Sequence, residues 1–246
     1  MDRMLYLAMA AAKNILQAQT VNSQNLANVN TSGFRADLSQ FISVPVTGNG
    51  LASRVYAVQD QPGTDFSYGR IDHTGNSLDI AVNGEGWIAI QMPDGSEAYT
   101  RAGDLRVSST GLLENGAGYP ALGNAGPITI PLADKIEIGE DGTISIHPTG
   151  QDEKTLSTID RIKLVNPPIE SLYKGKDGQF RLKDGSAAAA DSGVHIVSGA
   201  LESSNVNTVE ALVNMIDLAR QFEMSIKAMH SVEENDQTAT QLLRLG

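Results

Sequence analysis

The run from Asn207 to Leu245 constrains the fold more than any other stretch, because it contains neither Gly nor Pro. Apolar residues return along it at intervals of three and four, which predicts an amphipathic helix. The stripe consists of Leu212, Met215 or Ile216, Ala219, Phe222, Ile226, Met229 and Leu243. Asn207 and Glu210 form a capping-box pattern at its start. A helix of this length would span roughly 57 Å, so something outside a compact domain must cover its apolar face.

A second amphipathic helix is predicted from Asp2 to Ala27. Its stripe is rich in small residues that allow a neighbouring helix to come close: Leu5, Ala8 or Met9, Ala12, Ile15 or Leu16, Gln19 and Leu26. The rest of this helix carries Asn and Gln rather than charge. Amide side chains suit a crowded interface, although an ordinary solvated polar face is also open. Turn-forming residues at positions 28–33 predict the end of the helix.

Between the two helices the sequence predicts first an extended linker and then a β domain. Alternating segments, among them 78–82 and 88–92, are separated by Gly-containing turns every eight to twelve residues, which is typical of an all-β sandwich or barrel. Pro93-Asp94-Gly95 predicts a hairpin between 88–92 and 99–101. We therefore expect an α+β chain with four parts: helix 1–33, linker 34–70, β domain 71–200 and helix 201–246.

Composition excludes several classes of protein. The net charge of −11 and the pI near 4.7 argue against binding to nucleic acid or to anionic membranes. Because the chain has no Cys, it has neither disulfides nor thiolate metal sites. No run is long enough to span a membrane, and the N-terminus lacks the pattern of a cleaved signal peptide.

The sequence offers no motif for catalysis. The four histidines, His73, His147, His195 and His230, lie far apart without the spacing of metal ligands. Gly116-x-Gly118-x-x-Ala121 matches a dinucleotide fingerprint only in its letters, since Pro120 opposes the helix that must follow. We therefore expect no enzyme activity, no metal and no cofactor.

Three blocks of sequence, in order, resemble one known family. Residues 22–34 read NSQNLANVNTSGF, residues 203–223 read SSNVNTVEALVNMIDLARQFE, and residues 74–113 begin TGNSLDIAVNGEGWIAIQ. Together they are similar to the rod and hook family, the axial proteins of the bacterial flagellum. The resemblance covers nearly the whole chain and is greatest to the proximal-rod members, with the distal-rod paralogue as the nearest alternative.

The resemblance implies a structural subunit of the flagellar rod in the basal body. Such a subunit passes through the type III export apparatus without a cleaved signal, assembles helically with itself and with other proximal-rod and distal-rod subunits, transmits motor torque and lines the export channel. The fold it implies has long terminal helices that form an antiparallel coiled-coil-like inner layer of the tube, with the β domain outside. No membrane insertion is implied.

The same resemblance implies an assembly interface in both terminal segments. In the N-terminal segment the residues are Leu5, Ala12, Leu16, Asn25, Leu26, Ala27, Asn28, Asn30, Thr31, Gly33 and Phe34. In the C-terminal segment they are Asn205, Val206, Asn207, Met215, Ile216, Arg220, Phe222, Glu223 and Met229. Two other classes of protein remain open at this point. One is a secreted β-domain adhesin or carbohydrate-binding protein with a helical stalk, and the other is an enzyme whose carboxylates are brought together only by folding.

Overall fold

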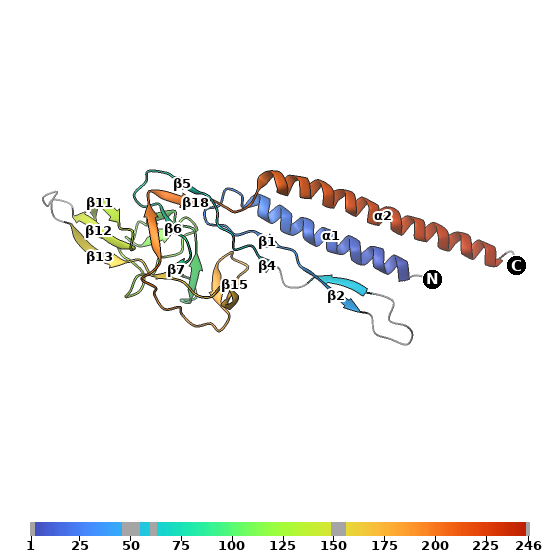
Figure 1. Cartoon of the computed structure of the whole chain (residues 1–246), viewed down its shortest axis with the longest axis horizontal. Helices are drawn as coiled ribbons and strands as arrows, with labels where there is room; N and C mark the ends of the chain where they lie inside the picture. The colour runs from blue at the N-terminus through green and yellow to red at the C-terminus, as the bar shows by residue number, and fades with distance from the viewer. Residues whose placement is uncertain (1–2, 46–54, 60–62, 149–155, 245–246) are drawn as a thin grey trace. The chain divides into compact units, whose positions relative to one another are not determined.

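The computed structural model describes residues 3–45, 55–59, 63–148 and 156–244 (Figure 1). The chain divides into two compact units. Unit 1 contains Met1–Val29, Arg35–Phe66 and Val206–Gly246, and unit 2 contains Asn30–Phe34 and Ser67–Asn205. The chain therefore passes between the units several times, and both of its ends belong to unit 1.

Unit 1 consists of two α-helices and two short antiparallel pairs of strands. The helices are α1 (Arg3–Ala27) and α2 (Thr208–Arg244), close to the ranges that the apolar spacing predicts. They lie side by side and antiparallel (Figure 1). Strand β1 (Asp37–Leu38) pairs with β4 (Gly63–Thr64), and β2 (Phe41–Pro45) pairs with β3 (Val55–Gln59).

Unit 2 is built from short antiparallel strands. Its largest sheet has five strands in the order β14 (Leu164–Val165), β7 (Trp87–Gln91), β8 (Glu97–Thr100), β16 (Phe180–Leu182) and β15 (Leu172–Lys174). A second sheet contains β11 (Ala133–Ile138), β12 (Thr143–Pro148) and β13 (Ser157–Arg161). A short 3₁₀ helix, η1, covers Ile169–Ser171.

Three two-stranded pairs complete unit 2. Strand β9 (Leu105–Val107) pairs with β10 (Leu113–Asn115), and β6 (Ile80–Asn83) pairs with β17 (His195–Ser198). Strand β5 (Ile71–His73) pairs with β18 (Ala200–Glu202). The predicted hairpin is confirmed, since Ile88 of β7 lies opposite Thr100 of β8.

The apolar core lies in unit 2. It collects residues from the two larger sheets and from the pairs, and most of them are almost completely buried: Ile80, Val82, Ile88, Leu105, Leu113, Ala121, Ile128, Ile130, Ile138, Ile144, Ile146, Ile162, Leu164, Val194 and Ile196. Among the described residues of unit 1, by contrast, the buried apolar residues are two alanines, Ala12 and Ala211. The hydrophobic stabilisation of the chain is thus concentrated in the β domain.

The predicted fold class is wrong. The structure has two terminal helices and a β-rich middle, and among the described residues these helices form no coiled-coil inner layer. A coiled coil requires a continuous seam of large apolar residues buried between the helices. Here only the small side chains of Ala12 and Ala211 are buried, while Leu16 and Ile216 remain about half exposed. The two helices therefore do not build a closed apolar layer by themselves.

Candidate assembly surface

The start of α2 is fixed by local hydrogen bonds. The side-chain Oδ1 of Asn207 accepts from the amides of Val209, at 3.0 Å, and of Glu210, at 3.3 Å. Asn207 is therefore the N-cap that the sequence predicts. One turn further on, the Asn22 side chain of α1 donates to the carbonyl of Ala211 at 2.7 Å. This bond joins the two helices where α1 approaches its end.

One side of α2 packs against α1. Along this side a residue is buried or half-buried at every third or fourth position: Ala211, Met215, Leu218, Phe222, Ile226, Met229 and Val232. Three residues of the predicted interface, Met215, Phe222 and Met229, belong to it. Within a single chain they are thus already partly covered by the other terminal helix.

The opposite side of α2 is also apolar, and it is exposed. At about 100° per residue, Val209, Val213 and Ile216 lie across the helix axis from Ala211, Leu218 and Phe222. Their exposed fractions are high: Val209 71%, Leu212 46%, Val213 52% and Ile216 55%, followed by Met224 at 60%. We call Val209, Leu212, Val213, Ile216 and Met224 the outer face of α2.

The sequence prediction merged these two sides into one stripe. Of the predicted interface residues on α2, Ile216, Arg220 and Glu223 are exposed and Met215, Phe222 and Met229 are half-buried. Val209, Val213 and Met224 were missed. The spacing of Val209, Val213 and Ile216, four and then three residues, is itself a helical repeat and is the signal that could have found them.

On α1, the side-chain amides of two asparagines form hydrogen bonds with the backbone of the same chain. Asn25 donates to the carbonyl of Asp37 at 2.8 Å and accepts from the amide of Asp37 at 2.9 Å, so it holds strand β1 against the helix. Asn14 donates to the carbonyl of Ala57 in β3 at 2.8 Å. These internal bonds account for part of the amide-rich surface that the sequence suggested was an intermolecular interface.

Other residues of α1 remain open to solvent. Tyr6, Met9 and Leu16 are exposed apolar side chains, of which the sequence prediction named only Leu16 as an interface residue. Leu5 and Leu26 are half-buried, Ala12 is buried and Ala27 is exposed. The exposed residues are three and seven apart, so they share one face of the helix.

The β2–β3 hairpin adds a third exposed apolar patch to unit 1. Phe41, Ile42 and Val44 of β2 and Val58 of β3 are all at least 40% exposed. An isolated two-stranded hairpin is at best marginally stable in water. The linker prediction for 34–70 missed this patch, because β2 has only one polar residue, Ser43, among its apolar residues.

The predicted interface residues at 28–34 and 205–206 differ from one another in their exposure to solvent. Asn28 is half-buried and donates to the carbonyl of Gln24 at 2.8 Å, whereas Asn30 and Thr31 are exposed. Gly33 is buried and Phe34, Asn205 and Val206 are half-buried. Gly33 has a positive φ of 65°, and the ammonium of Lys174 lies 4.1 Å from the centre of the Phe34 ring. Gly33 and Phe34 are thus held within unit 2.

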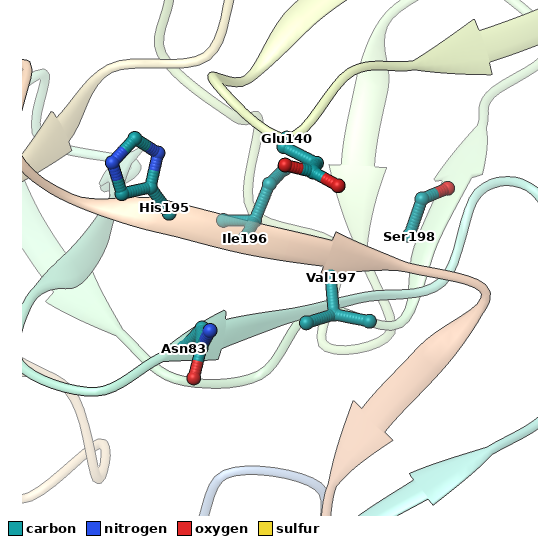
Figure 2. Close-up of a pocket in the computed structure, with 6 residues that line it drawn as sticks. All are labelled: Asn83, Glu140, His195, Ile196, Val197 and Ser198. Atoms are coloured by element: carbon teal, nitrogen blue, oxygen red, sulfur yellow. The ribbon is translucent and has the colours of Figure 1, made fainter.

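A hollow of about 450 Å³ in unit 2 is lined by Asn83, Glu140, His195, Ile196, Val197 and Ser198 (Figure 2). In this view the carboxylate of Glu140 lies over Ile196, and Val197 points to the other side of β17. His195 does not converge with Glu140 on a common point. The lining therefore lacks the paired acid and base that catalysis would use.

Metal binding and membrane crossing are two further functions to consider for the described residues. No group of three or more His, Asp or Glu side chains there could hold a metal ion. Neither described helix combines the length and apolar character that crossing a membrane requires. The exposed apolar side chains of unit 1 are therefore the candidate site.

Comparison with known proteins shows the family to which the chain belongs. Residues 197–242 match the family described as flagellar basal body rod FlgEFG protein C-terminal, and residues 81–146 match the flagellar hook protein FlgE/F/G D1 domain. The flagellar basal-body rod protein FlgF of Salmonella typhimurium is 43% identical, with all of both chains covered. The chain belongs to the FlgF family of flagellar basal-body rod proteins.

Other rod proteins are also similar. FlgF of Escherichia coli is 42% identical over the whole of both chains, and FlgG of Bacillus subtilis is 33% identical over 99% of this chain and all of its own. Membership of the FlgF family confirms the predicted rod protein of the flagellar basal body. It also confirms that the chain is a structural protein and not an enzyme, and the adhesin alternative has no support.

Proposed function

We propose that the chain works as a rod subunit that joins its neighbours through unit 1. The observation that carries the proposal is the outer face of α2, which is apolar, ordered at helical spacing and open to solvent in the single chain. Burying such side chains stabilises an interface by about 25 cal/mol for each Å² of apolar surface removed from water. Family membership supplies the class of neighbour, namely other flagellar rod and hook proteins.

The proposed interface contains the predicted residues that are exposed in the single chain. It also contains exposed apolar residues that the sequence prediction missed. From the prediction these are Leu16, Ala27, Asn207, Ile216, Arg220 and Glu223 of unit 1, together with Asn30 and Thr31, which directly follow unit 1 in the sequence and belong to unit 2. The additions are Tyr6 and Met9 of α1, Phe41, Ile42 and Val44 of β2, and the rest of the outer face. Because these patches differ from one another, a contact between unlike patches would be heterologous. Such a contact propagates as a helical array when the rotation between neighbours does not close a ring.

The finer parts of the function belong to the same proposal. A helical array of such subunits would transmit motor torque and line the export channel, with proximal-rod and distal-rod subunits as neighbours. Passage through the flagellar type III export apparatus without a cleaved signal would deliver the chain to the rod.

The decisive experiment compares two substitutions in the same turn of α2. Ile216→Asp places a charge in the outer face, whereas Asn214→Asp places the same charge at an exposed polar position nearby. Both variants should keep the stability of the isolated chain within about 0.5 kcal/mol. We expect Ile216→Asp to abolish rod assembly and swarming motility and Asn214→Asp to retain both. Normal motility with Ile216→Asp would contradict the proposed interface.

A further inference from the structure

The chain enters and leaves unit 2 through three short segments: Asn30–Phe34, residues 67–70 just before β5, and residues 202–205. All three meet at one residue, Glu202 of β18. Its backbone carbonyl accepts from the amide of Gly33 at 2.8 Å, and its side-chain Oε1 accepts from the amide of Gly69 at 2.9 Å. Glu202 is 1% exposed, so these bonds are sheltered from water.

The charge of Glu202 is balanced by Arg101. Nη1 of Arg101 lies 3.1 Å from Oε2 of Glu202, and each side chain is only 2% exposed. Arg101 also donates to the carbonyl of Gly84 at 2.6 Å. Its guanidinium carbon lies 5.1 Å from the centre of the Tyr68 ring and 5.4 Å from that of Trp87. The pair is therefore buried, hydrogen-bonded and flanked by aromatic rings, the conditions under which a buried ion pair is tolerated.

Close backbone contacts reinforce this arrangement. A Cβ on Gly33 would lie 2.2 Å from the carbonyl carbon of Arg101, and a Cβ on Gly69 would lie 1.9 Å from the carbonyl oxygen of Ser203. Both positions therefore admit only glycine. The side chain of Asn205 adds a bond to the carbonyl of Ser67 at 3.1 Å. The segments are thus tied together on both sides of Glu202.

We propose that Arg101 and Glu202 are positioning residues of a junction clamp, which holds the three connecting segments together as a single rigid exit from the β domain. The clamp goes beyond assembly itself, because it acts within unit 2 of an isolated chain. Its physical basis is the sharing of one buried carboxylate among several partners. Loss of the charge leaves the donors of Arg101 and Gly69 competing for fewer acceptors.

Amide hydrogen exchange of the isolated chain tests the clamp. In Glu202→Gln we expect the amides of Gly33 and Gly69 to exchange on the order of tenfold faster, while the amides of β7 and β8 keep their protection. Glu97→Gln is the matched control, because Glu97 forms an ion pair with Lys163 elsewhere in unit 2. It should leave Gly33 and Gly69 unchanged. Equal acceleration of all amides, or none at the two glycines, would overturn the proposal.

A double substitution keeps the test decisive if a single one prevents folding. Arg101→Met and Glu202→Met each leave one buried charge uncompensated, whereas the double variant removes both charges. We expect the double variant to recover most of the melting temperature that either single variant loses, and yet to retain fast exchange at Gly69. Additive losses of melting temperature would contradict a clamp built on this pair. Neither experiment involves rod assembly, so failure here leaves the proposed interface standing.

Discussion

The two units of the chain differ in how far their apolar residues are buried. In unit 2, Ile80, Ile88 and Ile144 are completely buried in a core to which several sheets contribute residues. In unit 1, side chains of the same kind, such as Ile216 and Val209, remain more than half exposed on a helix. The difference teaches that the β domain is stabilised within one molecule, whereas the helical unit of the single chain leaves large apolar side chains in contact with water.

The largest expected effect compares one residue type in the two units. Ile144→Ala removes a fully buried side chain of β12 and should cost about 4 kcal/mol of unfolding free energy. Ile216→Ala removes an exposed side chain of α2 and should change the same quantity by less than about 0.5 kcal/mol. Urea unfolding of both variants measures the difference. Similar losses would remove the distinction between the units.

A second test concerns how the chain leaves the β domain. Gly33→Val introduces a β-branched side chain at a φ of 65° and against the backbone of Arg101. We expect a loss of about 3 kcal/mol, part from the left-handed conformation and more from the overlap. Gly75→Val is the control, since Gly75 has a φ of 76° but nothing within 4 Å of the added Cβ. An equal loss at Gly75 would show that steric overlap at Gly33 contributes nothing.

The half-buried side of α2 gives a smaller effect in the isolated chain. Phe222→Ala should cost about 1 to 2 kcal/mol there, because α1 covers only part of the ring. In cells, motility should fall further than this loss explains, since the same substitution loosens the helix that carries the outer face. Denaturation of the purified variant and swarming assays measure the two effects. Unaltered swarming would show that this helix pair is dispensable for assembly.

The smallest effect concerns the pH dependence of unit 2. Burial, and then the charge of the neighbouring Asp79, raise the pKa of Asp104 above its ordinary value of 3.8. The folded chain therefore holds this proton more tightly than the unfolded chain, so the carboxyl favours folding at acidic pH. This contribution is lost as the pH rises through the folded pKa. Asp104→Asn should consequently raise stability at pH 7 more than at pH 4, as urea unfolding at both values would show.

The control for that variant has the opposite sign. Hydrogen bonds from the side chain and backbone of Thr143 lower the pKa of Asp141. That carboxylate therefore favours folding above its unfolded pKa, and the benefit is lost as the pH falls through its folded pKa. Asp141→Asn should reduce stability at pH 7 and have little effect in acid. If both variants respond to pH in the same direction, the electrostatic explanation of Asp104 is wrong.

Local features of the fold could be predicted from the sequence because local chemistry determines them. The β7–β8 hairpin follows from alternation around Pro93-Asp94-Gly95, and Asn207 caps α2 as its side-chain chemistry requires. Long-range features could not be predicted. The pairing of β5 with β18 joins His73 to Ala200, and nothing in either segment specifies the other.

The candidate site shows the same limit. A stripe of three- and four-residue spacings on α2 cannot reveal that the apolar residues form two opposite sides, because both sides satisfy the same spacing. The coiled-coil-like layer that the resemblance implied is wrong for another reason, since the described parts of the two helices bury only the small side chains of Ala12 and Ala211. Glu202 and Arg101 are 101 residues apart. In the sequence, neither can be told from an ordinary charged residue of a strand or a turn. Only the fold brings them together.

The most direct measurement of the central claim is amide hydrogen exchange of the isolated chain in dilute solution, followed by mass spectrometry of its peptides. The predicted result is slow exchange in β6–β8 and β12, with much faster exchange along α1 and α2, because the helices lack a buried apolar seam. Equally slow exchange in the helices and in the β domain would contradict the account. The helical unit would then be complete without a neighbour.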